Sequence, residues 1–342
     1  MKKIMIIAAT ALLAVGCGSS TKYTLSGTMT DVTGSIEVLD PANGDVLASA
    51  TTEDGSFSIS GEVETPMQAY LGVDGQPVLA FFLEAGKLKV VEDGEMVIVK
   101  GTPANDAAAE VSAKQRVIEE KFYAEGTTDE EKEALLEEYD AIEAAALEEN
   151  LDNLYGLSLL QNAAYGMTGD EIIAAYEKLA PELQEMDRAK ALRERADILK
   201  ETEPGKPYKE IKQPTPDGGE AALSEVVAKN KYVLLDFWAS WCGPCMGEVP
   251  YMLEAYAEYK DKGFEIFGVS LDRSEEDWKN CIKEEKLDWV HVSTVTYWDN
   301  AAAKEYGVNS IPTNFLIDGN GNIVAKNLRG EDLAAKLAEL LN

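Results

Sequence analysis

The stretch YVLLDFWASWCGPC, at residues 232–245 of this 342-residue chain, decides the fold and indicates the chemistry. Residues 233–237 are apolar apart from Asp236 and predict a fully buried strand. A short turn follows, and the sequence predicts that a helix begins at Cys242. Unpaired N–H groups and the dipole at a helix start stabilise a thiolate, so we expect a lowered pKa for the Cys242 thiol.

The second cysteine of the stretch, Cys245, follows Cys242 by close to one helical turn, so the two sulfur atoms can meet. The pair can close a disulfide, or one sulfur can attack a mixed disulfide formed on the other. Pro244 suits a first helical turn, where its missing N–H would be unpaired anyway. A zinc half-site is an alternative, but Cys281 and His291 fit poorly as the other two ligands. A structural disulfide across so short a loop would add little stability.

The residues around this stretch alternate apolar runs with amphipathic segments, the pattern of an α/β layered fold. Further strands are expected at residues 264–269, 314–317 and 323–326, and helices at residues 248–262, 275–286 and 332–341. The sequence DGNG at 318–321 predicts a hairpin turn between the last two strands. Proline- and glycine-rich segments begin at residue 204, so we expect this domain to occupy residues 204–342.

The motif WCGPC at 241–245 resembles that of thioredoxin-fold proteins, and the wider pattern resembles the periplasmic branch that includes the cytochrome c maturation reductants. IPT at 311–313 looks like the cis-proline loop of that family, which faces the cysteines. Asp236 matches the buried acid that helps to move the proton of the resolving cysteine. EVP at 248–250 matches a glutamate and a proline found just after the motif in the maturation branch. The resemblance covers residues 204–342.

The resemblance implies a thiol–disulfide oxidoreductase. Cys242 would attack a substrate disulfide, and Cys245 would resolve the mixed disulfide with help from Asp236. Glu248 is a second acidic candidate. Substrate contacts are expected from Trp241, beside an exposed Cys242, and from Gly243, Pro244, Ile311 and Pro312. No metal and no cofactor beyond the Cys242–Cys245 disulfide is expected. The Gly-Pro pair resembles reducing members, which implies protein disulfides as substrates and a membrane electron donor for the thiols.

Two other functions remain open. One is a peroxidase of the peroxiredoxin type, which requires threonine or serine three residues before its reactive cysteine and proline seven residues before it. This chain has Ala239 and Leu235 at those positions. A non-enzymatic binding or scaffold lipoprotein is the second, because residues 23–203 exceed half the chain. We interpret Cys281 as a small buried hydrophobe, with a spare redox thiol as the alternative, and His291 as a strand residue without a catalytic role.

The first residues have the features of a targeting signal. A basic start and an apolar run at 4–15, too short to span a bilayer, lead through small residues to Cys17. This resembles the bacterial lipoprotein signal, in which residues 1–16 are removed and the cysteine is lipidated; a secretory signal with a chance cysteine is the alternative. Residues 17–22 would then be a lipid-anchored tether. The uncharged residues after Cys17 resemble outer-membrane sorting, with the body facing the periplasm.

Two further segments separate the tether from the α/β domain. Residues 23–103 predict a small antiparallel β sandwich or barrel, because short alternating segments are separated by turn signals. A lipoprotein cysteine before such a module resembles Bacteroidetes thioredoxin-like lipoproteins. Residues 104–203 predict helices, one of them opened by a capping box of Thr128 and Glu131. Their 26 acids against 10 bases indicate solvated helix faces, with docking of a basic partner as the alternative.

The composition of the chain excludes several classes of function. The net charge of −31 argues against nucleic-acid binding and against docking on anionic lipid through a basic face. A single histidine excludes a multi-histidine metal site. An apolar content of 45% indicates a globular chain. We therefore expect a cell-envelope protein of α/β class, with a C-terminal thioredoxin-like fold preceded by an antiparallel β domain and a helical segment.

Overall fold

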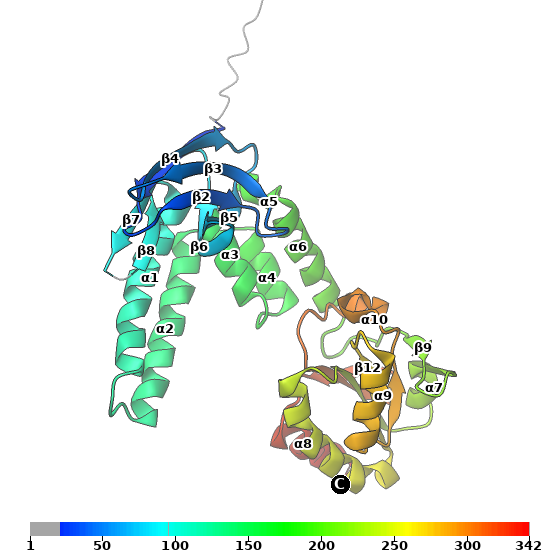
Figure 1. The fold of residues 1–342 in the computed structure, drawn as a ribbon. Coiled ribbons are helices and arrows are strands. Elements are labelled where there is room, and N and C mark those ends of the chain that lie inside the picture. The colour runs from blue at the N-terminus through cyan, green and yellow to red at the C-terminus, as the bar shows by residue number, and fades with distance from the viewer. Residues whose placement is uncertain (1–20, 95, 342) are drawn as a thin grey trace, which may run out of the picture. The chain divides into compact units, whose positions relative to one another are not determined.

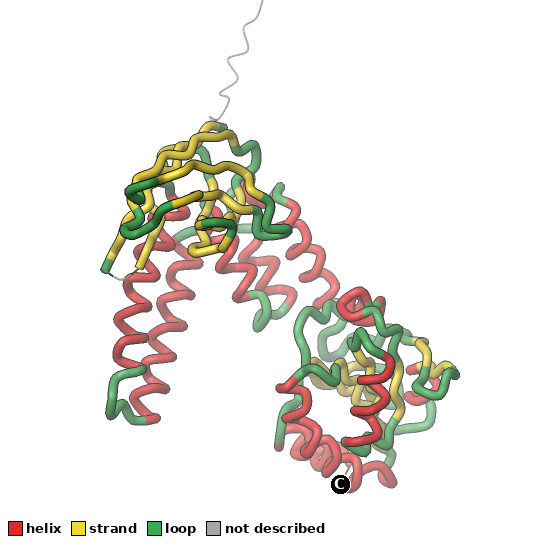
Figure 2. The backbone as a smooth tube through the Cα atoms, in the orientation of Figure 1, coloured by secondary structure: helices red, strands yellow, loops and turns green. Residues whose placement is uncertain are grey.

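The computed structural model describes residues 21–94 and 96–341, drawn in colour in Figures 1 and 2. The chain divides into two compact units, Met1–Leu159 and Leu160–Asn342. The expected signal peptide, residues 1–16, and the expected lipidation site Cys17 lie outside the described residues. Within the described part of the chain, every helix is too short or too polar to span a lipid bilayer.

The first unit contains two four-stranded sheets, whose strands are yellow in Figure 2, and side chains of both sheets share one apolar core. Their orders are β4-β1-β7-β8 and β3-β2-β5-β6. The strands are β1 Lys22–Thr28, β2 Gly34–Leu39, β3 Val46–Thr52, β4 Ser56–Glu62, β5 Met67–Val73, β6 Gln76–Leu83, β7 Gly86–Asp93 and β8 Met96–Lys100. Side chains from both sheets, among them Leu25, Ile36, Leu71 and Leu88, are fully buried in this core.

One strand pair departs from the antiparallel arrangement that the sequence predicts. β1 and β7 pair in parallel, which is possible because a long stretch of chain connects them and no tight turn has to join their ends. The two backbones approach closely at Gly27, where a Cβ atom would lie 2.4 Å from the carbonyl oxygen of Val90. Glycine is therefore required at this position by the close approach of the strands.

Six helices follow the strands, and two of them open on complete capping boxes. They are α1 Pro103–Phe122, α2 Asp129–Glu149, α3 Leu154–Ala163, α4 Gly169–Tyr176, α5 Pro181–Gln184 and α6 Asp187–Lys200. The predicted box of Thr128 and Glu131 opens α2, and an equivalent box of Thr168 and Glu171 opens α4. α1 and α2 belong to the first compact unit, whereas α4 to α6 belong to the second, where α4 packs against α6.

The second unit is built around a five-stranded sheet of order β13-β12-β11-β14-β15. Its strands are β11 Tyr232–Trp238, β12 Phe264–Ser270, β13 Val290–Val292, β14 Thr313–Asp318 and β15 Ile323–Lys326. Its main helices are α8 Gly243–Tyr259, α9 Glu275–Glu284 and α11 Glu331–Leu341, and α8 packs against α11. The short elements β9 Lys212–Pro214, β10 Glu220–Ala222, α7 Leu223–Val227 and α10 Ala301–Glu305 complete it. This is the thioredoxin-like fold that the sequence predicts.

The central strand, β11, positions the cysteines. It pairs in parallel with β12 and antiparallel with β14, and both of its faces are covered, which explains its continuous apolar sequence. Its end leads directly to Cys242, the N-cap of α8, so the prediction of a helix start at the first cysteine is confirmed. The expected range of 248–262 begins five residues too late, because the cap at Cys242 starts the helix at Gly243, and α8 ends at Tyr259, before a 3₁₀ turn at Lys260–Lys262.

Candidate active site

Cys242 and Cys245 are joined by a disulfide with an S–S distance of 2.07 Å at the start of α8. The Cys245 N–H donates a hydrogen bond to the Cys242 sulfur at 3.2 Å, and that sulfur lies 3.7 Å from the carbonyl oxygen of Ile311. In the reduced protein the same donor and the helix dipole favour the thiolate of Cys242. Cys242 is only 4% exposed, whereas Trp241 is 48% exposed. The expectation of an exposed nucleophile is therefore wrong for the disulfide form, because the residues around the sulfur bury it.

The loop before β14 faces the disulfide. The Ile311–Pro312 peptide bond is cis, as the sequence predicts. The register of β14 against β11 pairs Thr313 with Phe237, which fixes this loop beside the end of the strand that carries the cysteines. Ile311 and Pro312 are half-buried, so part of each remains available at the surface next to the disulfide.

Asp236 is buried in β11 behind the cysteines and is 4% exposed. Burial raises the pKa of its carboxyl to about 7; Glu248 also raises this pKa, and the Arg329 guanidinium lowers it. Among the described residues, no side chain or backbone N–H donates a hydrogen bond to this carboxyl. Asp236 and Cys245 line the same small cavity of ≈ 10 Å³, which has room for a single water molecule. The acid is thus able to exchange a proton near neutral pH beside the second cysteine.

Arg329 is a site residue that the sequence analysis missed. Its guanidinium donates hydrogen bonds to the carbonyl oxygens of Pro312 and, at 2.9 Å, of Leu328. Burial lowers the pKa of Arg329, whereas the charges of Asp236 and Glu248 raise it. Arg329 therefore links the cis-proline loop to the buried acid. It follows the last strand without any local motif, so only the tertiary structure reveals its role.

Glu248 and Asn314 hold the loop that carries Arg329. The N–H of Gly330 donates to Glu248 Oε2 at 2.8 Å. Asn314 exchanges two hydrogen bonds of 2.9 Å with Leu328, donating from Nδ2 to the carbonyl and accepting at Oδ1 from the N–H. Glu248 therefore joins the site through this loop and through its charge near the buried acid, whereas the sequence analysis associated it only with the cysteines.

Trp241 is part of an aromatic cluster, which we define as exposed Trp241 with half-buried Tyr297 and Trp298. The Trp241 ring centroid lies 5.2 Å from that of Tyr297 and 6.4 Å from that of Trp298. The Arg273 guanidinium covers the Tyr297 ring at 3.7 Å from its centroid. The aromatic surface beside the disulfide is thus larger than the single tryptophan expected from the sequence, because Tyr297 and Trp298, in a 3₁₀ helix far along the chain, pack against Trp241.

Cys281 and His291 are not among the described residues that contact the disulfide or the buried acid. The Cys281 thiol is buried 3.7 Å from the sulfur of Met246, and burial together with nearby acids raises its pKa to about 11. This environment confirms its interpretation as a small buried hydrophobe. His291 lies in β13 with its Nε2 3.2 Å from the carbonyl oxygen of Leu287, and burial lowers its pKa to about 4.

Comparison with known proteins agrees with this geometry. A family described as thioredoxin-like matches residues 230–323, and a domain of unknown function, DUF4369, matches residues 23–108. The thiol-disulfide oxidoreductase ResA of Bacillus thuringiensis subsp. konkukian (strain 97-27) is 39% identical over 114 residues, 33% of this chain and 63% of the relative. Among solved structures, the thioredoxin domain of a thiol-disulfide oxidoreductase from Bacteroides vulgatus is 39% identical, with 41% of this chain and 99% of that chain covered and a TM-score of 0.39.

The match to a second ResA defines the family. The chain spans less than two thirds of the length of the first curated relatives that it matches. The ResA of Geobacillus thermodenitrificans (strain NG80-2) is 33% identical over 127 residues, 36% of this chain and 70% of the relative. Through its thioredoxin-like C-terminal domain, the chain therefore belongs to the family of the thiol-disulfide oxidoreductases ResA.

Proposed function

We propose that this protein reduces disulfide bonds in other proteins through the Cys242–Cys245 pair. The observation that carries the proposal is the position of the Cys242 sulfur. It lies at the N-terminus of α8, accepts a hydrogen bond from the Cys245 N–H and faces the cis-proline loop at 3.7 Å from the Ile311 oxygen. A sulfur in this environment is both favoured as a thiolate and next to backbone groups that can hold an extended substrate.

The first step is attack on the substrate. The Cys242 thiolate forms a bond to one sulfur of the substrate disulfide, and the other substrate sulfur leaves as a thiolate. The product is a mixed disulfide between Cys242 and the substrate. Exposed Trp241, with Gly243, Pro244, Ile311 and Pro312, surrounds the disulfide and would contact the substrate at this stage.

The second step releases the substrate. Asp236 takes the proton of the Cys245 thiol, directly or through the single water that their shared cavity can hold. The Cys245 thiolate then attacks Cys242, the protein disulfide forms, and the second substrate sulfur leaves as a thiolate. Two electrons pass from the cysteine pair to the substrate, and the protein is left in the disulfide form seen in the structure. A dithiol electron donor in the membrane would then reduce the pair again.

The proposed location follows from the sequence before the described residues. Cys17 after a short apolar leader supports a lipoprotein anchored in the bacterial cell envelope, with outer-membrane attachment and a periplasm-facing body. The location can be tested by labelling cells with a palmitate analogue. Incorporation should be lost in Cys17→Ala, whereas Cys281→Ala, a matched change at a buried cysteine, should retain it. Labelling that survives Cys17→Ala would refute the anchor.

Catalysed reduction of insulin by dithiothreitol tests the activity. The protein should accelerate insulin reduction, Cys245→Ser should accumulate a mixed disulfide, and Cys281→Ser should behave as the unmodified protein. Peroxide turnover is measured in parallel, because it would favour the peroxidase alternative. No acceleration of insulin reduction, together with no trapped mixed disulfide, would refute the proposal and favour a scaffold function.

A further inference from the structure

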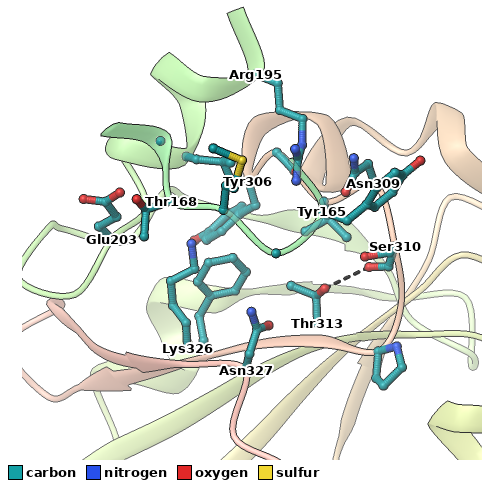
Figure 3. Close-up of a pocket in the computed structure, with 18 of the residues that line it drawn as sticks. Tyr165, Thr168, Arg195, Glu203, Tyr306, Asn309, Ser310, Thr313, Lys326 and Asn327 are labelled. Carbon is teal, nitrogen blue, oxygen red and sulfur yellow. Dashed lines mark hydrogen bonds between the residues drawn. The ribbon is translucent and has the colours of Figure 1, made fainter. Parts of the chain in front are cut away.

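A pocket of ≈ 470 Å³ lies within the second unit, beside the cis-proline loop (Figure 3). Its volume is that of an ordinary ligand site. One wall comes from the helical segment and includes Arg195 of α6, and the opposite wall comes from the sheet and includes Lys326 of β15. The lining contains three cationic side chains, Arg195, Lys326 and Arg329, but one acid, Glu203. The pocket is therefore positive in a chain whose net charge is −31.

The two cations on the opposite walls are not neutralised by ion pairs. Among the described residues, the Lys326 ammonium makes no ion pair or hydrogen bond, and it lies 5.1 Å from the centroid of the Phe315 ring. The Arg195 guanidinium donates to backbone carbonyls, from Nε to Gly307 at 3.3 Å and from Nη1 to Ala164 at 2.9 Å. Neither interaction supplies a negative charge, so both cations retain their capacity to bind an anion.

The pKa of Lys326 reflects its burial and the charges of both Glu203 and Arg195. Burial lowers the pKa of Lys326; the charge of Glu203 opposes this shift, and the weaker effect of Arg195 adds to it. Glu203 has one oxygen, Oε1, that is buried without a hydrogen-bond partner in the described part of the structure. In Figure 3, Glu203 lies beside Thr168 at the left of the pocket, and Arg195 enters from above, nearer the middle. A bound carboxylate would offset the excess positive charge.

The pocket adjoins the disulfide through Pro312. This residue lines the pocket and also the small cavity that contains Asp236 and Cys245. The carbonyl of the preceding residue, Ile311, faces the Cys242 sulfur. A polypeptide whose disulfide contacts Cys242 therefore has a short path along residues 310–313 into the pocket. The occupant that fits this continuity is a part of the same substrate and not an independent small molecule.

We propose that this pocket binds an acidic side chain of the polypeptide substrate, close in sequence to the cysteine that Cys242 attacks. The inference rests on the proposed thiol–disulfide activity and adds a specificity site to it. The negative charge of the whole chain does not oppose this, because charges on the surface are screened over about 8 Å at physiological salt whereas the contact in the pocket is local. Lys326 and Arg195 are specificity residues here.

The test compares two disulfide-linked peptides that differ only in carrying glutamate or glutamine near the cysteine, with the residue placed one to four positions away on either side. The measured quantity is the ratio of kcat/KM for the glutamate peptide to that for the glutamine peptide at low salt. A half-buried, charge-assisted contact predicts a ratio of about tenfold or more at the best position. Lys326→Met should bring this ratio close to one, and Lys326→Arg should largely restore it.

Lys336→Met is the matched control, because Lys336 pairs with Glu339 on α11 and does not line the pocket. Its ratio should equal that of the unmodified protein. A ratio near one for the unmodified protein at every position, with both peptides reduced, would overturn the pocket assignment alone. A tenfold ratio that Lys326→Met leaves unchanged would also overturn it. Reduction of neither peptide by the unmodified protein would refute the thiol–disulfide activity, and the specificity site with it.

Discussion

Replacement of Asp236 by asparagine separates the buried acid from the fold that surrounds it. Asparagine keeps the shape of the side chain but has no proton to accept or release in this pH range. The carboxyl of Asp236 has its pKa raised from 3.8 to about 7, which is about 3 units. At 1.36 kcal/mol for each unit, the buried carboxylate lowers the stability of the folded protein by about 4 kcal/mol above pH 7.

The sign of the pH dependence follows from proton binding. Below about pH 3, Asp236 is protonated in both the folded and the unfolded chain, so it contributes nothing to the dependence. Between about pH 4 and pH 7 the unfolded chain loses this proton while the folded protein keeps it, so this group lowers stability as the pH rises. Asp236→Asn removes that loss. Its gain in stability should be about 1 kcal/mol at pH 4.5 and approach about 4 kcal/mol at pH 8.

Urea unfolding of the disulfide form at pH 4.5, 6 and 8 measures this gain. Asp299→Asn is the control: this exposed aspartate pairs with Lys304, and its lowered pKa gives a pH dependence of opposite sign. Stopped-flow reduction of a model disulfide measures the kinetic counterpart. Loss of a general base slows a step by roughly 10²- to 10⁴-fold, and we expect this loss in the attack by Cys245. A gain independent of pH, or a defect confined to the attack by Cys242, would refute the reasoning.

Three further predictions use the environments of other titratable groups. Glu248→Gln should lower the pKa of the buried aspartate and Arg329→Met should raise it, as followed by the pH profile of the resolving step; shifts in the same direction would contradict the charge arrangement. In the reduced protein Cys242 should react with iodoacetamide at pH 7.5 at least about tenfold faster than Cys281, whose pKa is raised to about 11, and comparable rates by peptide mass mapping would count against a stabilised thiolate. The ring proton signals of His291, the single histidine, should not titrate between pH 5.5 and pH 8 in NMR spectra, because its pKa is about 4; a midpoint near 6.5 would show that the ring is solvated.

The sequence predicted the parts of the fold whose signals are local. The buried strand β11, the cysteine at the start of α8 and the capping box of Thr128 and Glu131 all depend on neighbouring residues, and the structure confirms each of them. The parallel pairing of β1 with β7 was not predicted, because it joins segments far apart in the chain and has no turn signal of its own.

In the candidate site, too, the features with local signals could be predicted and those formed by distant segments could not. Asp236 could be predicted to have a raised pKa because a carboxyl inside an apolar strand is desolvated whatever lies next to it. Arg329 could not be found in the same way, since its hydrogen bond to Pro312 forms only when the loop after β15 lies against the loop before β14. Tyr297 and Trp298 likewise reach Trp241, and Lys326 reaches the pocket, only through tertiary structure.

The distribution of the site along the chain has a consequence for synthesis. Both cysteines precede residue 246, but the cis-proline loop, Arg329 and the N–H of Gly330 that binds Glu248 all come from residues 311–330. A nascent chain that still lacks these residues already contains Cys242 and Cys245, but it has neither the loop that would hold a substrate nor the cation that adjusts the buried acid. The constellation described above is therefore assembled only after residues 311–330 have been made and have docked against the rest of the domain.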